Sequence, residues 1–318
     1  MISVDDVLAA RETIGRRLHR TPVFSSAALG DVTGARVFLK AELFQRTGSF
    51  KPRGVLTSVA ALNAEQRTRG VIAISAGNHA QAVAYAGAQE GLDALVVMWT
   101  GASAQKIAAT REYGATVDLA ATTPAEAFER LDELLEETGR TLIHPFDAAP
   151  TIAGQGTVGL EIVEDVPDAD VVVVPIGGGG LISGVAVAVK GMRPDARIIG
   201  VEPELSTAMH SALAAGERVE VTPASIADGL SAPHAGRMAL GICRQLVDEV
   251  VLVSEAEIRA GFRFLYERAK LAAEPAGAVA TAALLAGKVS LEPGSSVVSV
   301  VSGGNIAPRT ASDILASE

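Results

Sequence analysis

The sequence contains very little cysteine, histidine or aromatic side chain. Its 318 residues include one cysteine, five histidines and 4% aromatic residues. The single Cys243 cannot form an intrachain disulfide, and the scattered histidines form no cluster of transition-metal ligands. The hydrophobic fraction of 48% comes mainly from Ala, Val, Leu and Ile, which is typical of buried parallel strands flanked by helices rich in small residues.

Long apolar runs and an excess of positive charge are also absent. No apolar run reaches the length that spans a bilayer, and the opening segment MISVDDVLAARETIGRRL has no hydrophobic signal core. The formal charge of −10 disfavours binding to nucleic acid or to an anionic membrane, because both would repel the chain at long range. We therefore expect a soluble, cytoplasmic protein that binds neither nucleic acid nor membrane.

Strand-like and helix-like segments alternate along most of the chain. Strands are predicted to begin at Arg36, Val71, Ala94, Ala115, Val171, Arg197, Glu249 and Ser296. This alternation predicts an α/β fold in which mostly parallel sheets are flanked by helices. Ser3 with Asp6, and Ser254 with Glu257, have the spacing of helix N-terminal capping boxes.

Four consecutive glycines, Gly177 to Gly180, lie between a predicted buried strand and a predicted helix. Backbone N–H groups at the start of a helix favour an anion. The glycine spacing matches neither the nucleoside triphosphate loop nor the dinucleotide fingerprint, so the predicted ligand is a single phosphate. For this stretch alone, the alternative is a tight turn that binds no ligand.

Lys51 is predicted to lie at the start of a helix, because Pro52 suits the first helical turn. The helix dipole and the neighbouring Arg53 would both disfavour a charged ammonium, and a neutral amine can form a Schiff base. Considered alone, a lysine in this position is more often a solvated surface residue.

Two further segments present polar groups directly after predicted strands. In SAGNHAQ, the polar groups that could hold a carboxylate belong to Ser75, Gly77, Asn78 and His79. An ordinary helix cap is the alternative for that segment. In VVSVVSGGN, Ser302 is placed to meet a ring nitrogen, and a plain strand end followed by a turn is the alternative.

Seven short motifs follow one another along the chain: GSFKPRG, SAGNHAQ, IAGQGT, GGGGL, IADG, EPAGA and SGGN. In this order they resemble the threonine dehydratase and serine racemase family of pyridoxal-phosphate enzymes, over nearly the whole chain. The threonine dehydratase branch is the more similar one. The resemblance implies a tryptophan synthase β-like fold (PLP fold type II), with residues 1–65 and 148–318 as a large cofactor-binding domain and 66–147 as a small mobile domain. It also implies a homodimer or homotetramer.

The same resemblance implies a role for individual residues. Lys51 would carry pyridoxal 5'-phosphate as a Schiff base and remove the α-proton of the substrate, and Phe50 would lie against the pyridine ring. Asn78 would bind the ring hydroxyl, and Ser302 the ring nitrogen. The phosphate would be bound by the backbone N–H groups of Gly177, Gly178, Gly179, Gly180 and Leu181. The substrate carboxylate would be held by Ser75, Gly77, Asn78 and His79. Gly229 and Glu274 would lie near the cofactor.

The reaction implied by the resemblance is β-elimination, in which L-threonine or L-serine loses water and then ammonia to leave a 2-oxo acid. An amino-acid racemase is the main alternative, but racemase-like members have a serine where this chain has Ala76. Their metal site also uses an acid where this chain has Ala208, so no metal is expected beside Glu202. Hydroxyaspartate and bulkier β-hydroxy amino acids are compatible substrates. From a different class, a non-catalytic nucleotide-binding module is the alternative.

Overall fold

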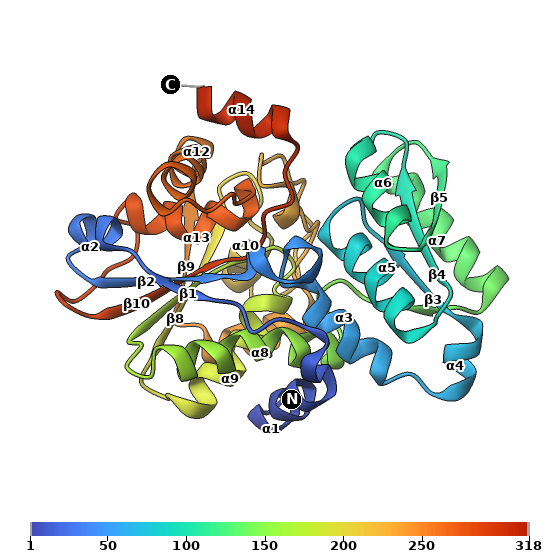
Figure 1. Cartoon of the computed structure of the whole chain (residues 1–318), viewed down its shortest axis with the longest axis horizontal. Coiled ribbons are helices and arrows are strands. Elements are labelled where there is room, and N and C mark those ends of the chain that lie inside the picture. Colours follow the sequence, from blue (N-terminus) through green and yellow to red (C-terminus); the bar gives the residue numbers. More distant parts are fainter. Residues whose placement is uncertain (1, 317–318) are drawn as a thin grey trace.

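The strands of the computed structural model, which describes residues 2–316, form two separate sheets (Figure 1). Within these residues the large sheet has the order β1-β2-β10-β7-β8-β9 and the small sheet has the order β5-β4-β3-β6. The strands of the large sheet are β1 (Val23–Ser25), β2 (Arg36–Ala41), β7 (Val171–Pro175), β8 (Arg197–Pro203), β9 (Glu249–Val253) and β10 (Ser296–Val301). Those of the small sheet are β3 (Val71–Ile74), β4 (Ala94–Trp99), β5 (Thr116–Ala121) and β6 (Thr141–Leu142).

Helices fill the connections between the strands. The helices that precede the small sheet or belong to it are α1 (Val4–Ile14), α2 (Ala27–Thr33), α3 (Lys51–Ala60), α4 (Ala64–Arg69), α5 (Asn78–Glu90), α6 (Ala104–Glu112) and α7 (Pro124–Thr138). Those that follow are α8 (Ala149–Asp165), α9 (Gly180–Met192), α10 (Ala208–Ala215), α11 (Arg237–Leu246), α12 (Glu255–Phe264), α13 (Pro275–Leu285) and α14 (Pro308–Ala316). Short turns are η1 (Gly15–Arg17), η2 (Glu42–Phe44), η3 (Arg46–Gly48), η4 (Asp228–Leu230) and the π-helical η5 (Leu265–Ala269).

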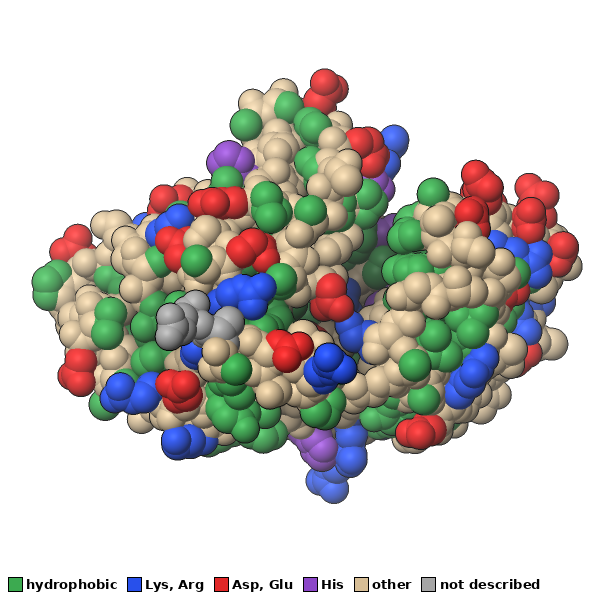
Figure 2. Space-filling view, turned by 90° about the horizontal axis from the view of Figure 1, so that it is seen from above, with side chains coloured by type: hydrophobic (Ala, Val, Ile, Leu, Met, Phe, Trp, Pro, Cys, Tyr) green, Lys and Arg blue, Asp and Glu red, His purple; other side chains and the backbone are tan. Residues whose placement is uncertain are grey.

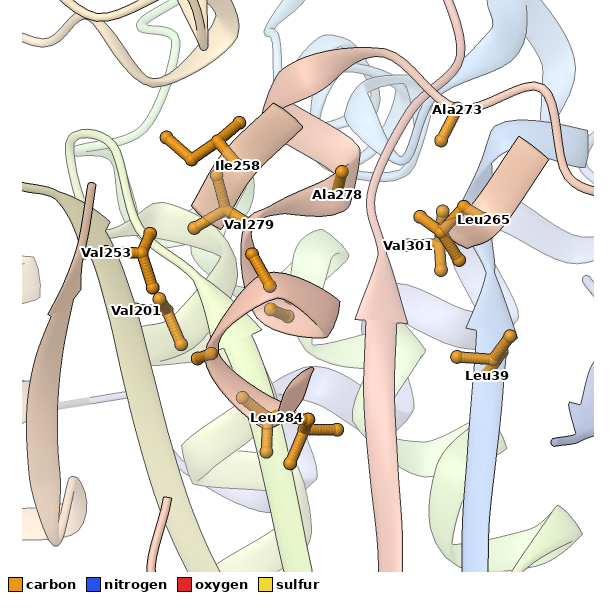
Figure 3. Close-up of a cluster of buried hydrophobic side chains, with 14 of the residues drawn as sticks. Leu39, Val201, Val253, Ile258, Leu265, Ala273, Ala278, Val279, Leu284 and Val301 are labelled. Atoms are coloured by element: carbon orange, nitrogen blue, oxygen red, sulfur yellow. The ribbon is translucent and has the colours of Figure 1, made fainter. Parts of the chain in front are cut away.

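The large sheet is buried on both faces, which explains its runs of consecutive valines. Successive side chains of a strand point to opposite faces. Val171 and Val173 of β7 pack into the cluster formed with α12 and α13, whereas Val172 and Val174 pack into the cluster formed with α8, α9 and α11. Figure 3 shows Val279 of α13 within the first of these clusters. Burial on both faces is typical of parallel strands.

The small sheet shares part of its core with α3. Val55 and Val59 of α3 pack with Val71 and Val96 of the small sheet in one apolar cluster, and α7 covers the opposite face. Helix α3 also contacts α8, so it connects the small sheet to the helices of the large sheet (Figure 1). Lys51 is the first residue of this connecting helix.

The eight predicted strands are all present, and the mixed α/β fold class is confirmed. Both predicted capping boxes are also found, at α1 and α12. Strands β1 and β6 were not predicted, because three and two residues are too few to show an alternating pattern. Strand β1 runs antiparallel to β2, and the other described strand pairs are parallel.

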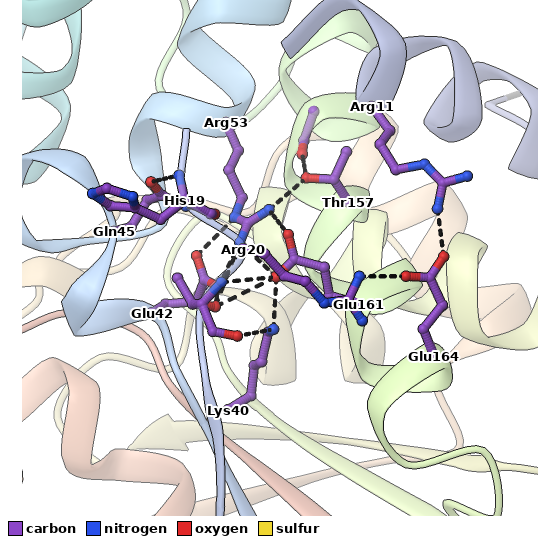
Figure 4. A network of polar contacts seen from close by, with 12 residues as sticks. Arg11, His19, Arg20, Lys40, Glu42, Gln45, Arg53, Thr157, Glu161 and Glu164 are labelled. Carbon is purple, nitrogen blue, oxygen red and sulfur yellow. Dashed lines mark hydrogen bonds and ion pairs between the residues drawn. The ribbon is translucent and has the colours of Figure 1, made fainter. Parts of the chain in front are cut away.

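A buried network of charges connects α3 to β2 and α8 (Figure 4). The Arg53 side chain is 2% exposed and binds both carboxylate oxygens of Glu42 at 2.8 Å. Its Nη1 donates to Glu161 at 2.7 Å, and its Nη2, which also binds Glu42, donates to Glu161 at 3.0 Å. Lys40 donates to Glu161 at 2.6 Å. Burial alone would raise the pKa of Glu161, but the charges of Arg53 and Lys40 outweigh burial and lower it. Two cations and two anions therefore balance in the interior.

Arg53→Ala should lower the free energy of unfolding by about 3–5 kcal/mol, because Glu42 would stay buried without a cation and Glu161 would keep only Lys40. Arg11→Ala is the matched control, since Arg11 pairs with Glu164 through side chains that are 40% and 35% exposed. That control should cost less than about 1 kcal/mol. Urea unfolding of the cofactor-free variants, followed by circular dichroism, measures both values. If Arg53→Ala and Arg11→Ala lost the same free energy of unfolding, the structural role of the buried network would be contradicted.

Candidate active site

One pocket lies where neighbouring strands of the large sheet end. Strands β2, β10 and β7 lie side by side and run parallel, so their carboxyl ends meet at one edge. Ligands of α/β sheets bind at such edges. The pocket is lined by the predicted residues Phe50, Lys51, Asn78, Gly177, Gly178, Gly179, Gly180, Leu181, Gly229, Glu274 and Ser302. Figure 2 shows the surface hollowed between the small-sheet unit, on the right, and the rest of the molecule.

The glycine loop, Gly177 to Gly180, connects β7 to the start of α9. Gly179 has φ +95°, a left-handed conformation that favours glycine, and it is the N-cap of α9. A side chain on Gly178 would overlap the ring of Phe146. The first N–H groups of a helix have no partner within the helix, so the loop offers several free donors to an anion.

The Lys51 amine is held inside the pocket. Its Nζ donates to the carbonyl of Pro145 at 2.9 Å and lies 5.2 Å from the centre of the Phe50 ring. Burial lowers the pKa of Lys51 to about 8, and Glu274 partly opposes this shift. The prediction that Arg53 would help to discharge Lys51 was wrong, because two carboxylates neutralise the Arg53 guanidinium.

Asn78 belongs to a chain of polar groups on the wall of the pocket. Its Nδ2 donates to Glu274 at 2.6 Å, and its Oδ1 accepts from Asn305 at 2.8 Å. Burial, with a smaller contribution from Asp228, raises the pKa of Glu274 to about 7. A carboxyl group near Asn78 therefore exchanges a proton in the neutral pH range.

Ser75, Gly77 and His79 lie beside Asn78 along the chain but do not line this pocket. The Ser75 hydroxyl accepts from the N–H of Gly77 at 3.1 Å. The His79 ring bonds to the Ile143 carbonyl at 2.8 Å, and burial together with Lys51 lowers its pKa to about 3. The His79 ring is therefore neutral, its Nε2 is bound to Ile143, and its Nδ1 has no partner among the described residues. The backbone N–H of His79 lies in the first turn of α5.

Sequence reasoning missed several residues that line the pocket: Pro145, Phe146, Gln155, Pro175, Leu230 and Ala276. Pro145 and Phe146 belong to the segment HPFD, and Gln155 belongs to IAGQGT. Both segments stand out in the sequence, but neither shows which side chain faces the site. Asp147 of HPFD instead caps α11, accepting from the N–H groups of Arg237 and Met238 at 2.8 and 2.9 Å.

Glu202 has a structural role in the described part of the chain. Its two carboxylate oxygens accept from the N–H groups of Met209 and His210, each at 2.8 Å, at the start of α10. Burial raises its pKa to about 7. Between residues 2 and 316 no group of three or more His, Cys, Asp or Glu side chains is placed to hold a metal ion. In the same range, no helix is both long and apolar enough to cross a membrane.

The pocket combines an amine of lowered pKa, a glycine loop whose position at the start of a helix suits an anion, and the buried Ser302 at the end of β10. This arrangement fits an enzyme with a small cofactor that carries both a carbonyl group and a phosphate. The Gln155 amide, which has no partner among the described residues, leaves further hydrogen-bonding capacity in the same pocket.

The family described as "Pyridoxal-phosphate dependent enzyme" matches residues 14–303. L-threonine ammonia-lyase of Thermotoga maritima is 47% identical over 96% of this chain and 76% of that relative. Phenylserine dehydratase of Ralstonia pickettii is 43% identical over 88% and 86%. Maize serine racemase has a TM-score of 0.94 and is 38% identical, covering 98% of this chain and 96% of that one.

The chain therefore belongs to the pyridoxal-phosphate threonine/serine dehydratase and serine racemase family. Its cofactor is pyridoxal 5'-phosphate, and its fold is type II.

The rate of cofactor loading should depend on the pKa of Lys51. Only the neutral amine attacks a carbonyl, so the rate should rise about tenfold per pH unit below pH 8 and level off above it. Stopped-flow absorbance of cofactor-free protein mixed with pyridoxal phosphate measures this profile. A rate that still rises steeply at pH 10 would indicate an ordinary exposed lysine, whose pKa is about 10.4.

Proposed function

We propose that the ammonia-lyase reaction of this enzyme is the β-elimination of L-threonine or L-serine to a 2-oxo acid and ammonia. The observation that carries the proposal is the Lys51 amine, with its lowered pKa, in the same pocket as the glycine loop. The relatives named as ammonia-lyase and dehydratase, at 47% and 43% identity, support it. Because one of these relatives is named for phenylserine, an amino acid with a bulkier group on its β-carbon is the second candidate substrate.

The roles proposed for the residues follow from their positions in the pocket. When bound, pyridoxal phosphate withdraws electrons from the α-carbon of an amino acid. Lys51 is the Schiff-base residue, and its amine is the base that removes the α-proton. Phe50, whose ring centre is 5.2 Å from that amine, lies against the pyridine ring. The phosphate is bound by backbone N–H groups, which are those of Gly177, Gly178, Gly179, Gly180 and Leu181. Asn78 binds the ring hydroxyl and Ser302 the ring nitrogen, with Gly229 and Glu274 beside them.

We propose that the first turn of α5 and the loop before it hold the substrate carboxylate. The groups are the hydroxyl of Ser75 and the N–H groups of Gly77, Asn78 and His79. The start of a helix favours a negative charge, which suits this role. Because the Nε2 of the His79 ring is bound to Ile143, we assign its contribution to the backbone N–H at the start of α5.

Residues 66–147 are proposed to form a small domain that closes over the substrate, against a large domain of residues 1–65 and 148–318. Lys106 of α6 and Asp228 of η4 form an ion pair between these two parts of the chain. Asp228 is next to Gly229, which lines the pocket, so the ion pair joins α6 to the segment beside the site. Closure of this kind excludes water from the reaction.

The protein is also proposed to be cytoplasmic and to assemble as a homodimer or homotetramer. Phe24 and Phe44 are 42% and 48% exposed and pack edge to face at 6.1 Å. Phe24 lies on β1, the edge strand of the large sheet, where exposed apolar groups favour association. The buried Cys243 is a free thiol, as is common in proteins of reducing compartments.

Lys51→Ala should abolish release of 2-oxo acid from L-threonine and L-serine, by at least about 10²–10⁴-fold, because the variant loses its general base. Lys190→Ala is the control, since Lys190 pairs with Asp248 away from the pocket and its loss should leave turnover unchanged. Borohydride should attach the cofactor to the Lys51 peptide of the wild type. Full turnover by Lys51→Ala, or attachment elsewhere, would refute the assignment.

Ala76 makes elimination, not racemisation, the expected outcome, because a methyl group cannot return a proton to the second face of the α-carbon. Ala76→Ser should therefore increase the formation of D-serine from L-serine, with Lys51 still required. Chiral chromatography beside a 2-oxo acid assay measures both products. A wild type that racemises faster than it eliminates would contradict the proposed reaction and favour the activity named for the maize relative.

A further inference from the structure

The Gln155 side chain has no hydrogen-bond partner although it is deeply buried. It is 1% exposed, and among the described residues neither its Nε2 nor its Oε1 finds a partner. A buried amide normally makes hydrogen bonds, because leaving it without partners costs free energy. The same side chain lines the pocket that holds Lys51 and the glycine loop. An unpartnered amide at such a place indicates a ligand.

Helix α8, which carries Gln155, packs against both α3 and α9. A side chain added to Gly54, in the first turn of α3, would lie 2.5 Å from the Gln155 Nε2. One added to Gly184 of α9 would overlap backbone atoms of Ile152 and Gly156, on either side of Gln155 along α8. Lys51 begins α3 and Gly180 begins α9. Gln155 therefore lies where α8 packs against both helices, and it lines the same pocket as Lys51 and the glycine loop.

The pocket wall offers little positive charge to a bound anion, so a neutral hydrogen-bond donor such as the Gln155 amide matters for binding it. Among the described residues that line the pocket, Lys51 is the cation and Glu274 the acid, and no arginine is present. The amine of Lys51 is bound to Pro145 and is largely neutral above pH 8. A phosphate in this pocket must therefore be held by neutral donors, which makes each additional donor valuable.

We propose that Gln155 is a further ligand of the cofactor phosphate. Its Nε2–H group donates to a phosphate oxygen, and its Oε1 accepts the phosphate proton when the phosphate is monoanionic. The glycine loop supplies donors only, whereas the carboxamide supplies both a donor and an acceptor. The inference rests on the proposed position of the cofactor between Lys51 and the glycine loop.

The first test compares pyridoxal phosphate with pyridoxal, which lacks the phosphate, on cofactor-free protein. Gln155→Met keeps the length of the side chain and removes both polar atoms. It should weaken the affinity for pyridoxal phosphate by about ten- to hundredfold, the usual effect of a hydrogen bond to a charged group, and that for pyridoxal by less than about threefold. Gln155→Glu should weaken pyridoxal phosphate binding further, because it places a carboxylate against the phosphate.

Gln81→Met is the matched control, because Gln81 is a buried helical glutamine that does not line the pocket. It should leave both affinities unchanged. Without cofactor, Gln155→Met should melt at the same or a higher temperature than wild type, because it removes two buried polar atoms that lack partners. A variant that loses cofactor affinity while keeping thermal stability cannot be explained by a damaged fold.

A ³¹P NMR titration of the loaded proteins gives a second readout that does not depend on turnover. Loss of the donor in Gln155→Met should raise the pKa of the bound phosphate, because its dianion would lose a hydrogen bond. Equal losses of affinity for pyridoxal phosphate and pyridoxal, or no change in either, would overturn the inference and assign the amide to a water molecule. Borohydride attachment to Lys51 in the wild type would still support the proposed function in that case.

Discussion

The position of Lys51 depends on the buried ion pairs of Arg53, two residues further along α3. Arg53 binds Glu42, which follows β2, and Glu161 of α8, so one guanidinium connects three separate segments. Charges taken out of water must be paired in well-defined geometry, and any other placement of α3 would leave Glu42 without its cation and Glu161 with Lys40 alone. The network therefore fixes the start of α3, and with it the amine at the pocket.

The same geometry determines the charge state of the site. Because α3 begins inside the protein, the Lys51 amine is removed from water, and its pKa falls to about 8. Glu274 is also buried, and its pKa rises to about 7. Both groups can therefore change protonation near neutral pH, as acid–base catalysis requires. Neutral N–H donors at the start of α9 complete the pocket, and no arginine is among the described residues that line it.

Much of the site could be predicted because glycine, lysine and serine motifs occur directly after recognisable strands. The glycine loop and Ser302 follow β7 and β10, whose valine runs identify them as buried. The roles of single side chains were less predictable. Arg53 was expected to act on Lys51 but binds Glu42 and Glu161, and the His79 ring points to Ile143. Sequence spacing gives the neighbours along the chain, not the direction of a side chain.

The sequence by itself determined the α/β class, the eight longer strands, the family and the motifs that supply the pocket, since all of these are encoded in local patterns and their order. Only the tertiary structure decided which motif residues face the pocket. It placed Gln155 in one pocket with Lys51 and the glycine loop, and it set the direction and cause of each pKa shift. Burial and partners depend on segments far apart in the chain, such as Arg53 and Glu161, and no local pattern records those contacts.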